Sequence, residues 1–161
     1  MTERFPPLVA QTLAAAGWSP DRSDQSRGRE WGLRIAAHAT PGGRQHTVTD
    51  RAIEAYAEFG GLRVSPQGEG EQVAPSDVHL DPFLVRHSVE TLAELAEAIG
   101  APLSPLGEEG DGSGILALDE HGRVFVLDHT GDWFLGASLD EALTTLVLGH
   151  RPQRVRADGT W

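Results

Sequence analysis

The sequence contains no cysteine and no lysine among its 161 residues. The absence of cysteine excludes disulfide bonds and thiol catalysis, and it is typical of proteins that work in a reducing compartment. No run of about 18 consecutive apolar residues occurs, which excludes an ordinary transmembrane helix. Residues 1–7 lack an apolar segment, so we expect no secretory signal and a cytoplasmic location.

Basic residues are few and unevenly placed along the chain. Thirteen arginines stand against 24 acidic residues, which gives a formal charge of −11. Residues 67–141 carry sixteen of the acids and two of the arginines, whereas the flanking segments are slightly positive. Such an acidic block repels nucleic acids and anionic membranes and attracts a basic protein, although charge alone is equally consistent with plain solubility. The partner we expect is therefore a basic protein, and neither a nucleic acid nor a membrane.

The stretch 112–136 is the predicted structural centre of the chain. Three apolar runs rich in leucine, valine and aromatic residues are separated by turns at 119–122 and 128–132, and both turns contain aspartate and glycine. Short apolar runs joined by such turns are typical of antiparallel hairpins. We predict a three-stranded antiparallel meander over about residues 114–136, with the flanking helices packed on one of its faces.

Apolar periodicity and capping residues predict helices over 8–16, 47–59, 88–99 and 138–148. The last of these starts with a capping box formed by Ser138 and Glu141. Short strands are expected at 62–64 and 78–80.

Two segments are harder to assign. Residues 19–29 have the polarity of a loop, and residues 30–39 fit either a helix or a strand because Gly32 weakens both. The predicted fold class is α+β, with four or so helices packed against an antiparallel sheet. We expect a single domain over residues 1–161 that ends in a loosely held basic tail at 151–161.

No catalytic, cofactor-binding or metal-binding motif emerges from the residues. His79 and His121 have acidic neighbours but lack the spacing of a metal-ligand motif. The glycine-rich segment 107–114 carries three carboxylates and no lysine, which argues against a phosphate loop. The acid pairs at 108–109 and 119–120 have the residue type needed for glycoside hydrolysis, but adjacent acids on polar turns are typical of solvated surface. We expect no catalytic residue, no cofactor and no bound metal.

Several short stretches occur together in a characteristic order along most of the chain. They are Ala-Gly-Trp-Ser-Pro-Asp-Arg at 16–22, Tyr-Ala-Glu-Phe-Gly-Gly-Leu at 56–62, Leu-Asp-Pro at 80–82, Ile-Gly followed by Leu-Ser-Pro-Leu-Gly-Glu within 99–108, Leu-Asp-Glu-His-Gly-Arg-Val-Phe at 118–125, and Leu-Gly, Glu-Ala-Leu and Leu-Gly within 135–149. In this combination the chain resembles the SUKH superfamily, specifically the SUKH-3 type of bacterial immunity protein.

That resemblance implies an α+β fold with helices against an antiparallel sheet. It also implies a non-catalytic immunity role, in which the protein binds and neutralises a polymorphic bacterial toxin, often a nuclease or a deaminase. Other members of the superfamily, including a yeast cell-wall regulator, act as interaction scaffolds. A scaffold or regulatory domain without a toxin partner is therefore one alternative, and an unrecognised small-ligand-binding protein or hydrolase is another.

Under the immunity hypothesis, the acids on the loops that border the meander pair with arginine or lysine side chains of the toxin. Trp133 is the expected aromatic anchor if its ring is exposed. The carboxylates expected to bind the partner are Glu108, Glu109, Asp111, Asp119, Glu120 and Asp132.

Overall fold

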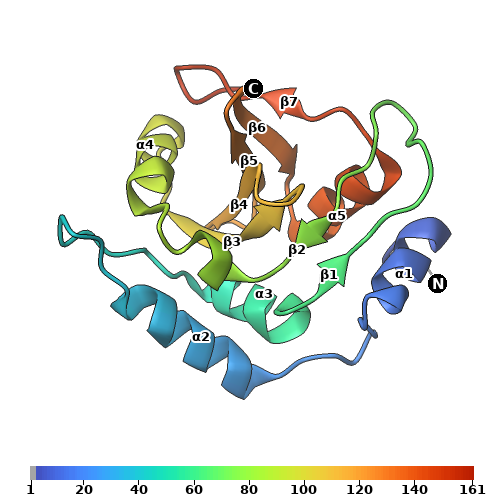
Figure 1. Cartoon of the computed structure of the whole chain (residues 1–161), viewed down its shortest axis with the longest axis horizontal. Coiled ribbons are helices and arrows are strands. Elements are labelled where there is room, and N and C mark those ends of the chain that lie inside the picture. The colour runs from blue at the N-terminus through green and yellow to red at the C-terminus, as the bar shows by residue number, and fades with distance from the viewer. Residues whose placement is uncertain (1–2) are drawn as a thin grey trace.

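The structure is a computed structural model that describes residues 3–161. Over this range the chain forms five α-helices, one 3-10 helix and seven strands (Figure 1). In chain order they are α1 (Pro7–Ala15), α2 (Gln25–Ala37), α3 (Asp50–Phe59), β1 (Arg63–Val64), β2 (Val78–His79), η1 (Pro82–Val85), α4 (Val89–Ile99), β3 (Leu103–Glu109), β4 (Gly114–Asp119), β5 (Val124–Asp128), β6 (Gly131–Gly136), α5 (Leu139–Leu148) and β7 (Gln153–Arg154).

The seven strands form one antiparallel sheet whose spatial order follows the chain, from β1 to β7. Strands β4, β5 and β6 are the predicted meander, and their pairing confirms it. The long strand β3, which was not among the predicted strands, extends the meander on one side. The α+β fold class is therefore confirmed.

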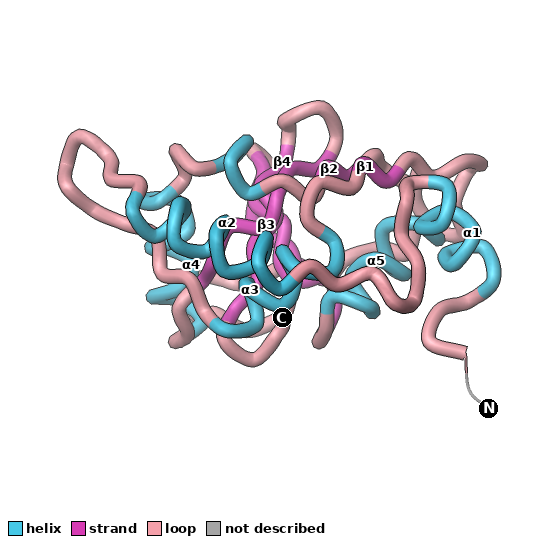
Figure 2. The backbone as a smooth tube through the Cα atoms, turned by 90° about the horizontal axis from the view of Figure 1, so that it is seen from below, coloured by secondary structure: helices cyan, strands magenta, loops and turns pink. Residues whose placement is uncertain are grey.

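Side chains alternate between the two faces of the sheet, and each face has its own apolar cluster. On one face, Leu116 and Val126 pack with residues of α1, α3 and α5, and we call it the α5 face. On the other, Ala117 and Phe125 pack with residues of α4, and we call it the α4 face. Seen from below, the strands run between α4 on one side and α5 with α1 on the other (Figure 2). The expectation that the helices pack on one face was therefore wrong.

Helix α2 forms an outer layer on α3 and corrects the loop expected over 19–29 (Figure 1). Its glycines are its contact points: Gly28 and Gly32 are both buried, and a Cβ on Gly28 would lie only 2.6 Å from the carbonyl oxygen of Ile53. Because the two helix backbones approach this closely, the residues that weaken a helix prediction are the ones that this packing requires.

The C-terminal segment is packed rather than loosely held. Strand β7 pairs with β6, and Val155 is buried on the α4 face. The ring of Trp161 stacks on Phe134 at 4.6 Å between centroids and meets Phe125 edge-on at 5.5 Å. These aromatic contacts hold the tail on the sheet, which corrects the expectation of a loose tail.

The capping box predicted at the start of α5 is confirmed. The backbone N–H of Glu141 donates to the Ser138 hydroxyl at 3.2 Å, and the Glu141 carboxylate accepts from the N–H of Ala137 at 2.8 Å. This arrangement fixes the turn between β6 and α5. Among the helices of residues 3–161, none is both long and apolar enough to cross a membrane.

Candidate partner-binding surface

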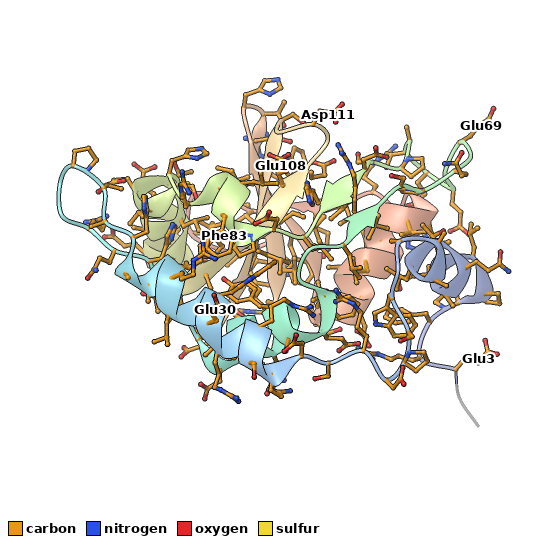
Figure 3. The ribbon with its side chains drawn as sticks, turned by 60° about the horizontal axis from the view of Figure 1, so that its bottom comes forward. Glu3, Glu30, Glu69, Phe83, Glu108 and Asp111 are labelled. Carbon is orange, nitrogen blue, oxygen red and sulfur yellow. The ribbon has the colours of Figure 1, made fainter. Side chains whose placement is uncertain are left out.

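Two hairpin turns bring carboxylates together at one end of the sheet. The β3–β4 turn and the β5–β6 turn lie at the same end, because Gly114 at the start of β4 pairs with Asp128 at the end of β5. Figure 3 shows Asp111 near the tip of the first turn with Glu108 close by, whereas Glu30 and Glu69 lie elsewhere on the molecule. We call this region the acidic end, and its members are Glu108, Glu109, Asp111, Asp128 and Asp132.

The acidic end is divided between the two faces of the sheet. Glu108 pairs with Ile115, and Asp132 pairs with Leu127 in the same cross-strand row, so both acids lie on the α4 face. Glu109 and Asp128 each follow a member of that row by one residue, and both pair with Gly114. Because successive side chains of a strand point to opposite faces of the sheet, these two acids lie on the α5 face. The acids therefore surround the hairpin tips instead of forming one flat patch.

Few cations neutralise these carboxylates. An ion pair at the acidic end joins the Arg63 guanidinium and the Asp111 carboxylate at 3.7 Å, and both side chains are largely exposed. An exposed pair of this kind contributes little to stability. Within residues 3–161, none of the other four carboxylates forms an ion pair.

Asp128 and Asp132 differ in how the fold treats their charge. Burial disfavours the ionised form of Asp128, but the hydroxyl and the backbone N–H of Thr130 donate to its carboxylate and lower its pKa overall. Burial raises the pKa of Asp132, and the nearby charges of Asp128 and Glu94 raise it further despite the opposing effect of Arg154. The fold therefore favours the ionised form of Asp128 and disfavours the ionised form of Asp132.

Asp119 lies at the β4–β5 turn, away from the acidic end, and its side chain has a structural role. Its side chain is 0% exposed, and its carboxylate accepts from the N–H groups of His121 and Arg123 at 2.9 Å each and from the Arg123 guanidinium. These bonds close the β4–β5 turn. Because no partner can reach this carboxylate, the prediction of Asp119 as a partner-binding residue was wrong.

Glu120 is exposed but lies at the far end of the meander. It follows the six-residue strand β4 and lies about 20 Å from Gly114 at the usual rise per residue. Its carboxylate lies 3.6 Å from the His121 imidazole. The structure therefore does not bring Glu120 together with the other predicted acids.

Trp133 lies at the acidic end, on the α5 face, and is half-buried. Its indole N–H donates to the Thr130 hydroxyl at 3.3 Å, and the Arg154 guanidinium lies over its ring at 5.4 Å from the centroid. The ring is thus held in place, with part of its surface available.

A groove of about 350 Å³ opens beside Trp133 on the α5 face. It lies between the β5–β6 hairpin, the C-terminal end of α5 and residues 73–76 of the segment between β1 and β2. Its apolar part comes from Val126, Leu135 and Leu146. Asp128 lines it together with Glu109, and Asp128 is the residue that sequence reasoning missed. The signal was present as the Asp-x-Thr pattern at 128–130, which is typical of an aspartate that accepts from the backbone two residues later.

The remaining histidine candidates do not converge. His79 lies in the sheet row that contains Glu108, while His121 lies at the opposite end of the meander. Among residues 3–161, no group of three or more histidine, aspartate or glutamate side chains is arranged to hold a metal ion.

Comparison with known proteins adds one finding. A family model described as SUKH-3 immunity protein matches residues 5–149 of the chain. No curated protein and no solved structure matches the chain at a significant level. The matched range includes the whole acidic end and stops just before β7.

Proposed function

Because the chain belongs to the SUKH-3 immunity protein family, we propose that it binds a toxin protein through the acidic end and blocks the toxin's activity without catalysing a reaction itself. The toxin is a basic enzyme that acts on nucleic acid, of the nuclease or deaminase class. The immunity role follows from the family, and the binding surface and the toxin class are the parts that we add.

One observation supports the choice of surface: five carboxylates surround two hairpin tips, and within residues 3–161 they form one exposed ion pair. An enzyme that acts on nucleic acid holds phosphates with arginine and lysine side chains. Carboxylates fixed on a rigid frame present charge of the same sign, attract such a surface at long range and occupy it on contact. Since the frame is already ordered, little conformational entropy is lost on binding.

The role itself is tested by co-expression. Each toxin domain encoded beside this gene is expressed in a susceptible host, with and without the chain, and colony survival is counted. We expect survival to be restored against one toxin, together with a stable complex on size-exclusion chromatography. Restored survival without a complex contradicts direct binding, and failure against every neighbouring toxin favours a scaffold role.

A further inference from the structure

The groove on the α5 face combines an apolar floor with two carboxylates on one rim. Val126, Leu135 and Leu146 provide the floor, and Glu109 and Asp128 provide the charge. Its volume of about 350 Å³ is near the lower limit of ligand pockets, which usually run from roughly 300 to 1,000 Å³. It therefore suits one long side chain better than a cofactor.

Three side chains on this rim are locked to one another. The Trp133 indole N–H donates to the Thr130 hydroxyl, and the same hydroxyl donates to the Asp128 carboxylate. This chain of hydrogen bonds fixes the edge of the indole ring relative to a carboxylate whose pKa is lowered despite its partial burial. A charged group and an aromatic ring are thus pre-positioned before any partner arrives.

Glu109 completes the rim because Gly114 has no side chain. Glu109 and Asp128 both pair with Gly114, one from each neighbouring strand, so their Cα atoms lie about 10 Å apart. A Cβ on Gly114 would lie 2.7 Å from the Glu109 carboxylate and 2.8 Å from a methyl group of Val126. The Glu109 carboxylate therefore lies across Gly114, in the space that a side chain there would fill. Within residues 3–161, the Glu109 carboxylate has no ion-pair partner.

We propose that this groove receives an arginine side chain of the bound toxin, whose guanidinium lies between Glu109 and Asp128 while its methylene stem covers Val126 and the edge of Trp133. The inference rests on the proposed function for its partner, but its chemistry can be tested without the toxin. A guanidinium fits better than an ammonium because it is planar, weakly hydrated and able to bond two carboxylates while it contacts an aromatic ring.

The charges around the rest of the groove orient the incoming group. His150 and Arg151 lie on the opposite rim, where His150 contacts Glu71. The Arg151 guanidinium repels a cationic head from that side, and the carboxylates of Glu109 and Asp128 attract it to theirs. Arg154 covers part of the Trp133 ring but does not line the groove.

The test titrates the full-length 15N-labelled chain with Nα-acetyl-L-arginine methylamide and, in parallel, with the lysine analogue at the same ionic strength. We expect saturable chemical-shift changes at Val126, Asp128 and the Trp133 indole N–H with the arginine compound, and weaker binding with the lysine compound. Glu109→Gln should weaken the binding about fivefold, which corresponds to about 1 kcal/mol. Glu108→Gln is the matched control, because it removes the same charge one residue away on the opposite face.

Three results would overturn the proposal: no saturable change at the groove, equal binding of the two compounds, or equal weakening by Glu109→Gln and Glu108→Gln. A last measurement adds a neutralised toxin to the labelled chain. Groove signals that stay unperturbed in that complex reject the docking role even if the arginine compound binds. If the arginine compound binds but the chain neutralises no toxin, the groove is a guanidinium site and the proposed immunity function is wrong.

Discussion

The two ends of the meander use the same residue type in opposite ways. At the β4–β5 turn, the Asp119 carboxylate is fully buried and accepts two backbone N–H bonds and the Arg123 guanidinium. At the acidic end, Asp111 is exposed and has only the distant Arg63 guanidinium. At the β4–β5 turn the carboxylate closes the turn, whereas at the acidic end the carboxylates remain accessible to a partner.

Turn sequence alone therefore does not distinguish a buried aspartate that closes a turn from an aspartate that remains accessible. Both Asp119 and Asp128 follow an apolar strand and precede a glycine by three residues. What separates them is the next arginine in the chain: Arg123 lies four residues after Asp119 and reaches back to it, whereas within residues 3–161 no arginine forms an ion pair with Asp128.

The largest effect is expected from Asp119→Ala. The substitution leaves two backbone N–H groups and the half-buried Arg123 guanidinium without their acceptor, and breaking a buried pair of this kind costs about 3 kcal/mol or more. Urea denaturation gives the change in the free energy of unfolding. Asp119→Asn, which keeps one acceptor oxygen, should cost about half as much. A change below about 1 kcal/mol in Asp119→Ala would contradict the structural role.

Thr130→Val should have an intermediate effect, because it removes the hydroxyl that joins Trp133 to Asp128. We expect a loss of about 1 kcal/mol of stability and a rise of the Asp128 pKa toward its usual value. Since the Asp128 pKa is lowered in the fold, its contribution to stability is present above pH 3.8 and is lost as the pH falls through the folded pKa. NMR titration of the Asp128 carboxyl measures this, and an unchanged pKa would count against the hydrogen-bond chain.

Asp132→Asn should have a smaller effect of opposite sign. The raised pKa of Asp132 means that its ionised form is disfavoured in the fold, so this group stabilises at acid pH and loses that contribution as the pH rises through the folded pKa. At pH 7 the amide variant should be slightly more stable, by less than about 0.5 kcal/mol because the side chain is partly hydrated. Thermal denaturation at pH 7 and pH 3 checks the sign, and a gain that persists at pH 3 would point to another cause.

Glu120→Gln should change almost nothing. The side chain is exposed at the end of the meander that we do not assign to binding, so stability should stay within about 0.5 kcal/mol and toxin affinity should be unchanged. A marked loss of toxin affinity, measured by calorimetry, would mean that the toxin binds at the β4–β5 turn and not at the acidic end.

Much of the fold is predictable because local signals agree with the tertiary structure. Apolar periodicity, capping residues and turn residues indicate the meander, the capped helix α5 and the helix α3 that ends at Gly60. Strand β3 escaped prediction because Pro105 and Gly107 argue against a strand, and the structure accommodates them with a shift of register between the two. One partner, β4, follows directly after the 110–113 turn, whereas the other, β2, lies more than 20 residues earlier, so no local pattern could indicate that second pairing.

The candidate site is less predictable, because residue type does not reveal which face a side chain occupies or what neutralises it. Glu108 and Glu109 are adjacent in the chain but lie on opposite faces of the sheet, and only the strand register shows this. Asp128 was missed because its place beside Glu109 comes from the pairing of both residues with Gly114. Asp119 was misassigned because its burial comes from the whole fold rather than from its turn.

The central claim is tested most directly by comparing two variants with the same change of charge. One replaces Glu108, Glu109 and Asp111 with lysine at the acidic end, and the other replaces Asp21, Glu30 and Glu120 with lysine at exposed sites elsewhere. Isothermal calorimetry against the neutralised toxin should show about 100-fold weaker binding for the first, about 2.7 kcal/mol, and a change within about threefold for the second. Equal losses in the two variants would mean that overall charge drives the interaction, and wild-type affinity in the first would contradict the assignment of the acidic end.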